Sequence, residues 1–151
     1  MDVFAYGTLT QPDRVASVVD SFVFVGAAVL EGCHPVDGRY PTLAPGGETA
    51  GRLLRTDDID ALDAYEGIGQ GLYVRVSAPR TDGGTAVVYV GDPAALDGVA
   101  HRSEHARDDD GDVSARSLTN QAAVEWPGEG TFAERVEQYF DSSVVVRPLP
   151  A

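Results

Sequence analysis

The sequence contains no lysine: all 11 basic residues are arginine, 24 residues are acidic, and the formal net charge at pH 7 is −13. Such a surface lacks the cations that neutralise a phosphate backbone, so nonspecific nucleic-acid binding is excluded as a function. High salt screens the repulsion among the carboxylates, and the charge balance therefore predicts a halophilic protein. An acidic face that docks a basic partner is a weaker interpretation, because the acids are spread along the chain.

Cysteine is almost as scarce, since Cys33 is the single one in the chain. One cysteine cannot form an internal disulfide, and no Cys/His set has the spacing of a zinc site, so neither a disulfide nor a bound metal is expected. Cys33 is expected to be a small buried side chain. No apolar run approaches the roughly 20 residues that cross a bilayer, and no signal sequence is recognisable. These absences predict a soluble, cytoplasmic protein without a membrane partner.

The length of 151 residues predicts a single domain over residues 1–151 with a real hydrophobic core. Within it, the acidic run 108–112 raises the possibility of a calcium loop. Position 119 is Thr119, where an EF-hand needs a bidentate glutamate, so this interpretation is disfavoured. Residues 91–130 are therefore expected to be a polar insertion or loop, and residues 131–151 a C-terminal helix and tail.

Apolar, β-branched and aromatic runs predict several strands, the last two of which are joined by a hairpin turn at residues 82–84. Residues 32–38 and 39–47 are rich in proline and glycine and are expected to be loops, the second with extended segments. The tail at 144–146 is either a last strand or an extended cover. The strands are predicted at residues 3–6, 21–30, 49–55, 72–79 and 86–90.

Helical spacing of apolar residues predicts a short helix after Pro12, a second over residues 57–67 and a third over residues 131–141. The second helix is expected to bury one face, which carries Ile59, Leu62 and Tyr65. Its acidic first turn suits the helix dipole.

The chain also offers two candidate chemical features. The first strand breaks at Gly7, and such a turn leaves backbone N–H groups that can hold a carboxylate or a developing oxyanion. Glu66 lies in the last turn of the second helix, where the helix dipole and partial burial both raise a carboxyl pKa. The alternatives are a tight turn at Gly7 without a ligand, a core aromatic at Tyr6, and a solvated Glu66. Tyr73 and Arg75 share one face of their strand, which is either a pocket wall or solvent-exposed.

Five short stretches, in order, carry a resemblance to a known family. They resemble the γ-glutamylcyclotransferase family in its compact, AIG2-like form, and they span roughly the first 90 residues. The segment after Pro93 matches no pattern of that family. The stretches are Phe4-Ala5-Tyr6-Gly7-Thr8-Leu9, Tyr40-Pro41-Thr42-Leu43, Ala50-Gly51-Arg52-Leu53-Leu54, Leu62-Asp63-Ala64-Tyr65-Glu66-Gly67 and Tyr73-Val74-Arg75-Val76.

The resemblance implies an α+β fold, a small mixed β-barrel with flanking helices. It implies that Glu66 is the catalytic acid/base. It also assigns substrate binding to further residues, with Arg75, like Tyr89, matching the family less securely. Many relatives have serine where this chain has Thr8, which keeps the hydroxyl. The implied substrate-binding residues are Tyr6, Gly7, Thr8, Leu9, Tyr73 and Arg75.

The family reaction agrees with these residue types. Release of 5-oxoproline requires the substrate's own α-amine to attack its γ-carbonyl, so one proton carrier is enough and no cofactor is needed. The expected partner is a small-molecule γ-glutamyl amine, amino acid or peptide. Two alternatives remain open: a cyclotransferase that deprotects a γ-glutamyl-capped metabolite, and a non-catalytic module that binds small carboxylates or a protein.

Overall fold

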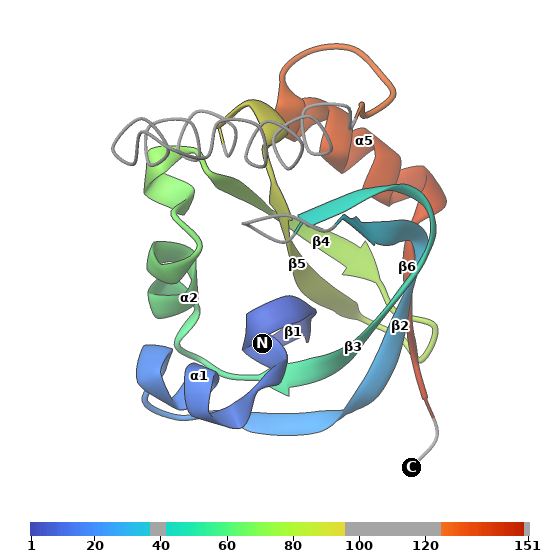
Figure 1. Ribbon diagram of the computed structural model, residues 1–151. Helices are drawn as coiled ribbons and strands as arrows, with labels where there is room; N and C mark the ends of the chain where they lie inside the picture. Colours follow the sequence, from blue (N-terminus) through green and yellow to red (C-terminus); the bar gives the residue numbers. More distant parts are fainter. Residues whose placement is uncertain (37–41, 96–124, 150–151) are drawn as a thin grey trace, which may run out of the picture.

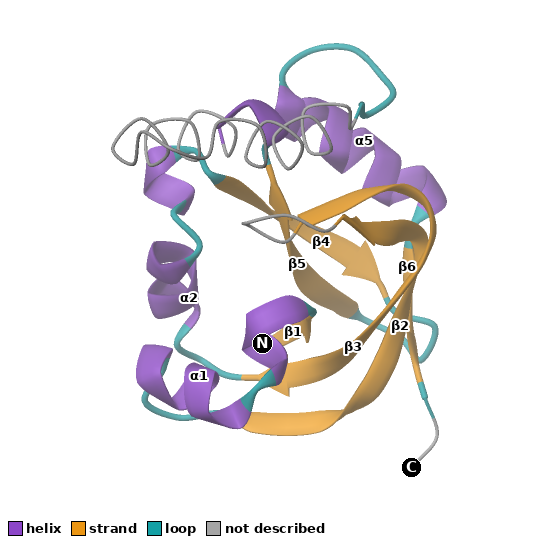
Figure 2. Ribbon diagram, in the orientation of Figure 1, coloured by secondary structure: helices purple, strands orange, loops and turns teal. Residues whose placement is uncertain are grey.

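The computed structural model describes residues 1–36, 42–95 and 125–149. Its centre is one six-stranded sheet in the order β4-β5-β1-β3-β2-β6 (Figures 1 and 2). Neighbouring strands are antiparallel except β1 and β5, which run parallel. The strands are β1 (Asp2–Ala5), β2 (Val23–Val36), β3 (Thr42–Arg55), β4 (Tyr73–Pro79), β5 (Thr85–Gly91) and β6 (Val145–Pro148).

The sheet curls until its two edges approach each other. Arg80, just after β4, forms a bridge with Val146 of β6, and the Thr81 N–H donates to the Val146 carbonyl at 2.9 Å. The predicted α+β class, a mixed barrel with flanking helices, is thus confirmed in the form of a partly closed barrel. The tail that was left open between strand and extended cover is a strand.

The helices are α1 (Pro12–Val18), α2 (Ile59–Tyr65) and α5 (Phe132–Ser143), and all three match predicted segments. Thr131 caps α5 through a capping box with Glu134, the arrangement that satisfies the first free amides of a helix. In the described ranges, no helix has the length and apolar character required to cross a membrane.

Two apolar cores lie on the two faces of the sheet, because side chains alternate along β1. Val3 and Ala5 face the core that α1 and α2 cover. Phe4 faces the other core, which α5 closes with Phe140. The helices occupy matching positions in Figure 1, with α1 and α2 together on one side and α5 apart from them.

The loops predicted within residues 32–47 are wrong wherever the structure describes them. Residues 32–36 and 42–47 belong to the long strands β2 and β3, which pair along their length with a bulge between Glu31 and Cys33. Tyr139 of α5 holds both arms, since its hydroxyl donates to the Gly32 carbonyl at 2.6 Å and accepts from the Gly46 N–H at 3.0 Å. Tertiary pairing therefore outweighs the local proline and glycine content.

Tyr65 is also placed differently from the prediction. Leu62 is buried and Ile59 is partly buried, but Tyr65 is 40% exposed. It is the last residue of α2. The acidic run 108–112, with His101 and His105, lies outside the described residues.

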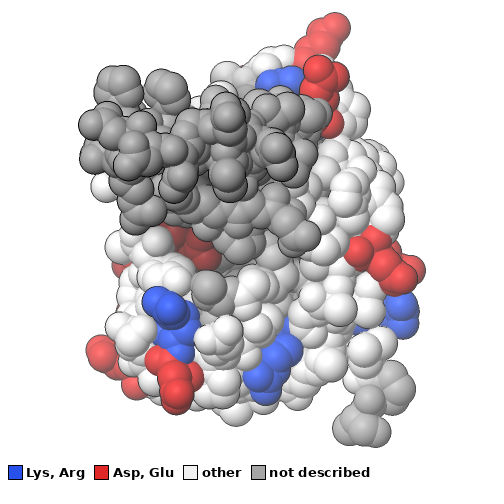
Figure 3. Space-filling model, viewed as in Figure 1, with Lys and Arg blue, Asp and Glu red and all other residues white. Residues whose placement is uncertain are grey.

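Acidic side chains are dispersed on the surface. On the face drawn in Figure 3, aspartate and glutamate occur in small groups with arginines beside several of them. Arg55 and Asp2 form an ion pair, with Nε to Oδ1 at 2.7 Å. This distribution suits solvation better than the docking of a single basic partner.

Candidate active site

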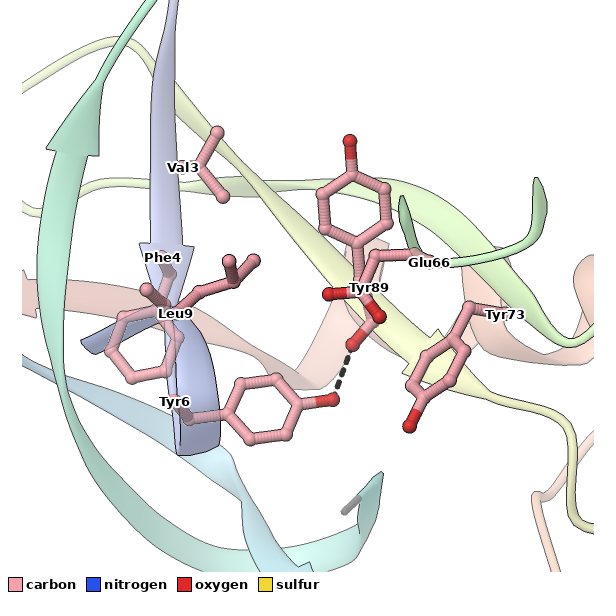
Figure 4. A pocket seen from close by; sticks show the side chains of 8 residues that line it. Val3, Phe4, Tyr6, Leu9, Glu66, Tyr73 and Tyr89 are labelled. Atoms are coloured by element: carbon pink, nitrogen blue, oxygen red, sulfur yellow. Dashed lines mark hydrogen bonds between the residues drawn. The ribbon is translucent and has the colours of Figure 1, made fainter. Parts of the chain in front are cut away.

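One small cavity joins the N-terminal strand to the end of α2 (Figure 4). Its volume is about 40 Å³. The wall combines aliphatic side chains with three phenols and one carboxyl group. The lining residues are Val3, Phe4, Ala5, Tyr6, Leu9, Glu66, Tyr73 and Tyr89.

Glu66 reaches this cavity because α2 ends abruptly. The residue caps the helix with its N–H bonded to the Leu62 carbonyl at 2.9 Å. Gly67 then adopts φ +70, and a Cβ there would lie 2.8 Å from Leu72 Cδ1. A left-handed turn packed this closely requires glycine. The end of α2 therefore carries the Glu66 side chain to the cavity wall.

The environment of Glu66 favours its neutral form. Burial raises the pKa of the Glu66 carboxyl from an ordinary value of 4.5 to about 7. At neutral pH the group is then divided between its acid and its carboxylate, the condition in which one side chain can both accept and donate a proton. The rise in the Glu66 pKa has the direction predicted from the sequence.

Tyr6 lies across the cavity from Glu66. Its hydroxyl donates to the backbone carbonyl of Tyr89, and Figure 4 shows its phenol and the Glu66 carboxyl pointing into the same space. Burial, followed by the charges of Tyr73 and Glu66, raises the pKa of Tyr6 well above its ordinary value. Tyr6 therefore remains a neutral hydrogen-bond donor at physiological pH.

The turn after Tyr6 is a 3₁₀ segment, Gly7–Thr10, in which Thr8 follows Gly7. Gly7 has φ +78, and the Thr10 hydroxyl donates to the Gly7 carbonyl at 2.6 Å. Arg52 of β3 donates to the Thr10 carbonyl at 2.8 Å. Leu9 is buried and lines the cavity. The turn is thus closed by an internal hydrogen bond and tied to β3 at its C-terminal end, and Leu9 reaches the cavity wall whereas Gly7 does not line it.

Tyr73 and Arg75, expected together at the substrate, take different positions. Tyr73 is buried and lines the cavity. Arg75 is not part of the cavity wall: its side chain is 40% exposed, and its Nη1 donates to Asp63 Oδ2 at 2.7 Å. Of these two residues, Tyr73 therefore lines the cavity and Arg75 instead pairs with Asp63 outside the cavity wall.

Asp63 is a feature that sequence reasoning did not single out. Its Oδ1 accepts the Tyr89 hydroxyl at 2.7 Å, while Oδ2 accepts from Arg75. The sequence feature that could have identified Asp63 is its spacing: it lies three residues before Glu66, which places both carboxyl groups on one side of a helix.

The remaining metal-ligating and nucleophilic side chains of the described residues are dispersed. No cluster of three or more His, Cys, Asp or Glu side chains there could hold a metal ion. Burial raises the pKa of the Cys33 thiol to about 12, so it stays protonated and unreactive. Cys33 is buried, as predicted. His34 contacts the Gly46 carbonyl through Nδ1 at 2.8 Å.

The raised pKa of Glu66 has a consequence for stability. A folded-state pKa of about 7 against 4.5 means that the folded protein loses stability as pH rises through this interval, because the buried carboxyl must ionise. We expect Glu66→Gln, which stays neutral, to be more stable than wild type at about pH 8 by about 1–2 kcal/mol, allowing for partial exposure. The advantage should shrink as pH falls and vanish below about pH 4.5, the lower end of the interval.

Urea unfolding of both proteins across this pH range, at constant high salt, measures the difference. Other acids titrate equally in the two proteins and cancel in it. A constant stability difference from low to high pH would contradict the burial of an ionisable Glu66.

Comparisons with known proteins agree with this architecture. The sequence matches the family model described as gamma-glutamyl cyclotransferase, AIG2-like, over residues 3–112. An uncharacterised protein from Homo sapiens has a similar structure, with 18% identity and a TM-score of 0.50, over 91% of this chain and 96% of that one. No curated protein sequence matches the chain.

Two further solved structures are similar. One, named gamma-glutamyl cyclotransferase, is 17% identical with a TM-score of 0.48, and the match covers 94% of this chain and 99% of that one. The other, from Arabidopsis thaliana, is 27% identical with a TM-score of 0.47, and covers 69% and 84%. The family match carries the assignment, because it spans most of the chain, including Gly7 and Glu66. This chain belongs to the AIG2-like γ-glutamyl cyclotransferase family.

Proposed function

We propose that this protein is an enzyme that cyclises a γ-glutamyl amine, amino acid or peptide to 5-oxoproline and releases the free amine. One observation carries the proposal. A carboxyl group with a pKa of about 7 shares a small cavity with Tyr6 and Leu9, at the turn that follows β1, although about 60 residues separate Tyr6 and Glu66 in the sequence.

Glu66 moves the protons of the proposed reaction. Its carboxylate takes a proton from the substrate's α-ammonium group, and the freed amine attacks the γ-carbonyl carbon, which forms the ring C–N bond. The tetrahedral intermediate collapses as the bond to the leaving amine breaks and Glu66 returns the proton to that nitrogen. The ring nitrogen then gives up its remaining extra proton, which ends on the released amine, so the products are 5-oxoproline and an ammonium ion. Proton transfer of this kind contributes about 10²–10⁴-fold, and folding one substrate onto itself adds a proximity effect.

The turn at residues 6–9 binds the γ-glutamyl group in this proposal. The carbonyl oxygen becomes negative as the ring closes, and backbone N–H groups of Gly7 to Leu9 are suited to stabilise it, at typically about 3 kcal/mol per donor. Tyr6 and Leu9 line the same cavity, and so does Tyr73 on the opposite wall. Substrate binding by Tyr6, Gly7, Thr8, Leu9 and Tyr73 thus remains our assignment.

The size of the cavity bears on the range of substrates. A space of about 40 Å³ admits a few atoms, while ligand pockets that enclose a whole molecule are typically about 300 Å³ or larger. The reacting end of the substrate therefore enters, and the leaving amine stays in the open mouth. We expect the enzyme to tolerate different leaving groups.

The test is product formation. Purified protein in high salt is incubated with γ-glutamyl amines, amino acids and peptides, and 5-oxoproline is measured. Release from at least one class is expected, and a substrate screen identifies a capped metabolite if that is the true substrate. Saturable binding of 5-oxoproline without turnover of any compound would instead favour a non-catalytic binding module.

The pH dependence provides a separate expectation. Because the carboxylate form of Glu66 must accept the first proton, kcat/KM should rise with pH with a midpoint near the Glu66 pKa of about 7. Initial rates at low substrate concentration, measured between about pH 5 and pH 9, test this. A profile that is already flat above about pH 5 would show that an ordinary, solvated carboxyl is responsible.

A further inference from the structure

Both carboxylate oxygens of Asp63 are occupied by groups from different strands. Oδ1 accepts the hydroxyl of Tyr89 on β5, and Oδ2 accepts Nη1 of Arg75 on β4, each at 2.7 Å. Asp63 itself belongs to α2. One side chain therefore ties this helix to two adjacent strands that line the cavity.

The helix depends on such ties. α2 has only seven residues, and a helix this short is marginal without tertiary contacts. Leu62 anchors it by burial, which fixes its depth but not the direction of its last turn. Asp63 and Glu66 lie three residues apart, so they face the same way. The contacts of Asp63 therefore fix the direction in which Glu66 points.

The same contacts extend to the other side of the cavity. Tyr89, held by its hydroxyl, accepts the Tyr6 hydroxyl at its backbone carbonyl. A continuous series of bonds thus runs from Arg75 through Asp63 and Tyr89 to Tyr6. Glu66 lies beside the Tyr89 and Tyr6 end of that series, as Figure 4 shows.

We infer that Asp63 is a positioning residue for Glu66: by holding Tyr89 and Arg75 with its two oxygens, it keeps the Glu66 carboxyl inside the cavity. The kinetic part of this inference rests on the proposed function. It also changes the role expected for Arg75, which acts through Asp63 and does not contact the substrate. The charge of Arg75 is already matched by Asp63, and Arg75 does not line the cavity.

The central variant is Asp63→Ala. We expect kcat to fall about 10- to 100-fold while KM stays within about threefold, since misplacement of a catalytic group by about 1 Å can cost this much. Asp60→Ala is the matched control, because it removes the same charge from an exposed position on the same helix. It should change kcat by less than about twofold.

A direct readout on Glu66 separates positioning from a general loss of structure. NMR titration of glutamate carboxyl carbons should give a Glu66 pKa of about 7 in wild type and a lower one in folded Asp63→Ala, because water reaches the displaced carboxyl. Among the described residues, the other titratable groups near Glu66 are Asp63 on its own helix and the phenols of Tyr6, Tyr73 and Tyr89. Burial raises the pKa of Tyr6 and of Tyr89, so both stay neutral in this range.

If Asp63→Ala fails to fold, less disruptive variants test whether Asp63 positions Glu66. Tyr89→Phe removes one hydroxyl and should lower kcat and the Glu66 pKa in the same direction, by less. Arg75→Lys should retain activity, because the contact uses a single nitrogen, while Arg75→Ala should lower kcat at constant KM. A rise in KM of more than about tenfold in Arg75→Ala with kcat unchanged would overturn the inference, since that pattern indicates substrate binding.

The proposed function and this inference can fail separately. If wild type releases no 5-oxoproline from any substrate, the function fails, while the titration still tests the positioning. An unchanged Glu66 pKa in folded Asp63→Ala and Tyr89→Phe would overturn the positioning whatever the activity.

Discussion

Glu66→Gln should lower kcat by about 10²- to 10⁴-fold with little change in KM, the range that removal of a general acid/base produces. Glutamine has nearly the same shape and can still fill the cavity wall, but it cannot take up or release a proton at these pH values. The assay is 5-oxoproline release at saturating substrate and about pH 8, where wild-type Glu66 is mostly ionised.

A loss of folding cannot explain this result if the expected stability gain is observed. The same variant should be more stable than wild type at high pH, because it removes the cost of ionising a buried carboxyl. Low activity in a more stable protein isolates the proton-transfer role. This combination is also typical of functional sites, which hold groups at a cost to stability.

Glu137→Gln provides the control, since it makes the same chemical change at an exposed position of α5. Its activity should stay within about twofold of wild type. Equal rates of product release from wild type and Glu66→Gln would show that another group carries the proton. The enzymatic role of Glu66 would then be abandoned, even though its location in the cavity would stand.

Local patterns were sufficient for part of the fold. The strands at 72–79 and 86–90 were predicted because side chains alternate along the first and a Gly-Gly turn separates the two. The end of α2 was predicted because Gly67 punctuates a helical pattern. In each case a few neighbouring residues determine the local structure.

Long-range contacts determined what the sequence could not predict. The arms of β2 and β3 over residues 32–47 look like loops locally, but they pair with each other and are held by Tyr139, more than 90 residues away from Gly46. The prolines and glycines of these arms disfavour a strand locally, but the pairing between the arms stabilises the strands more. No local pattern contains Tyr139.

In the candidate site, too, one part could be predicted from the sequence and another part depends on long-range contacts. The identity of Glu66 could be proposed from its place in the sequence, but the walls that bury it come from β1, β4 and β5. Arg75 was expected at the substrate because of its family resemblance, while the alternation along the strand of Tyr73 left that face open between a pocket wall and solvent. The partner of Arg75, Asp63, lies on another element, α2. The alternation of side chains shows which residues share a face of the strand. Only tertiary packing determines whether that face borders a cavity, another element or solvent.

Gly51→Ala should destabilise the protein by about 3 kcal/mol, at the upper end of what overpacking costs. A Cβ at Gly51 would lie 2.3 Å from the Ala5 carbonyl oxygen and 2.6 Å from Phe4 Cζ. Phe4 is almost fully buried, and the Ala5 oxygen is backbone, so neither can move without shifting β1. Thermal unfolding should show a melting temperature lower by roughly 6–12 °C.

The neighbouring strand offers the matched substitution, Gly26→Ala, because a Cβ at Gly26 meets no atom within 4 Å. It should change stability by no more than about 0.5 kcal/mol. The contrast also bears on function, since Phe4 and Ala5 line the cavity with Glu66. If β1 shifts to make room for the new methyl group, turnover by Gly51→Ala should fall even at temperatures where it is folded, while Gly26→Ala keeps wild-type turnover. Equal melting temperatures for the two variants would mean that β1 and β3 do not approach each other this closely at Gly51. The positions of Phe4 and Ala5 in the cavity wall would then be wrong.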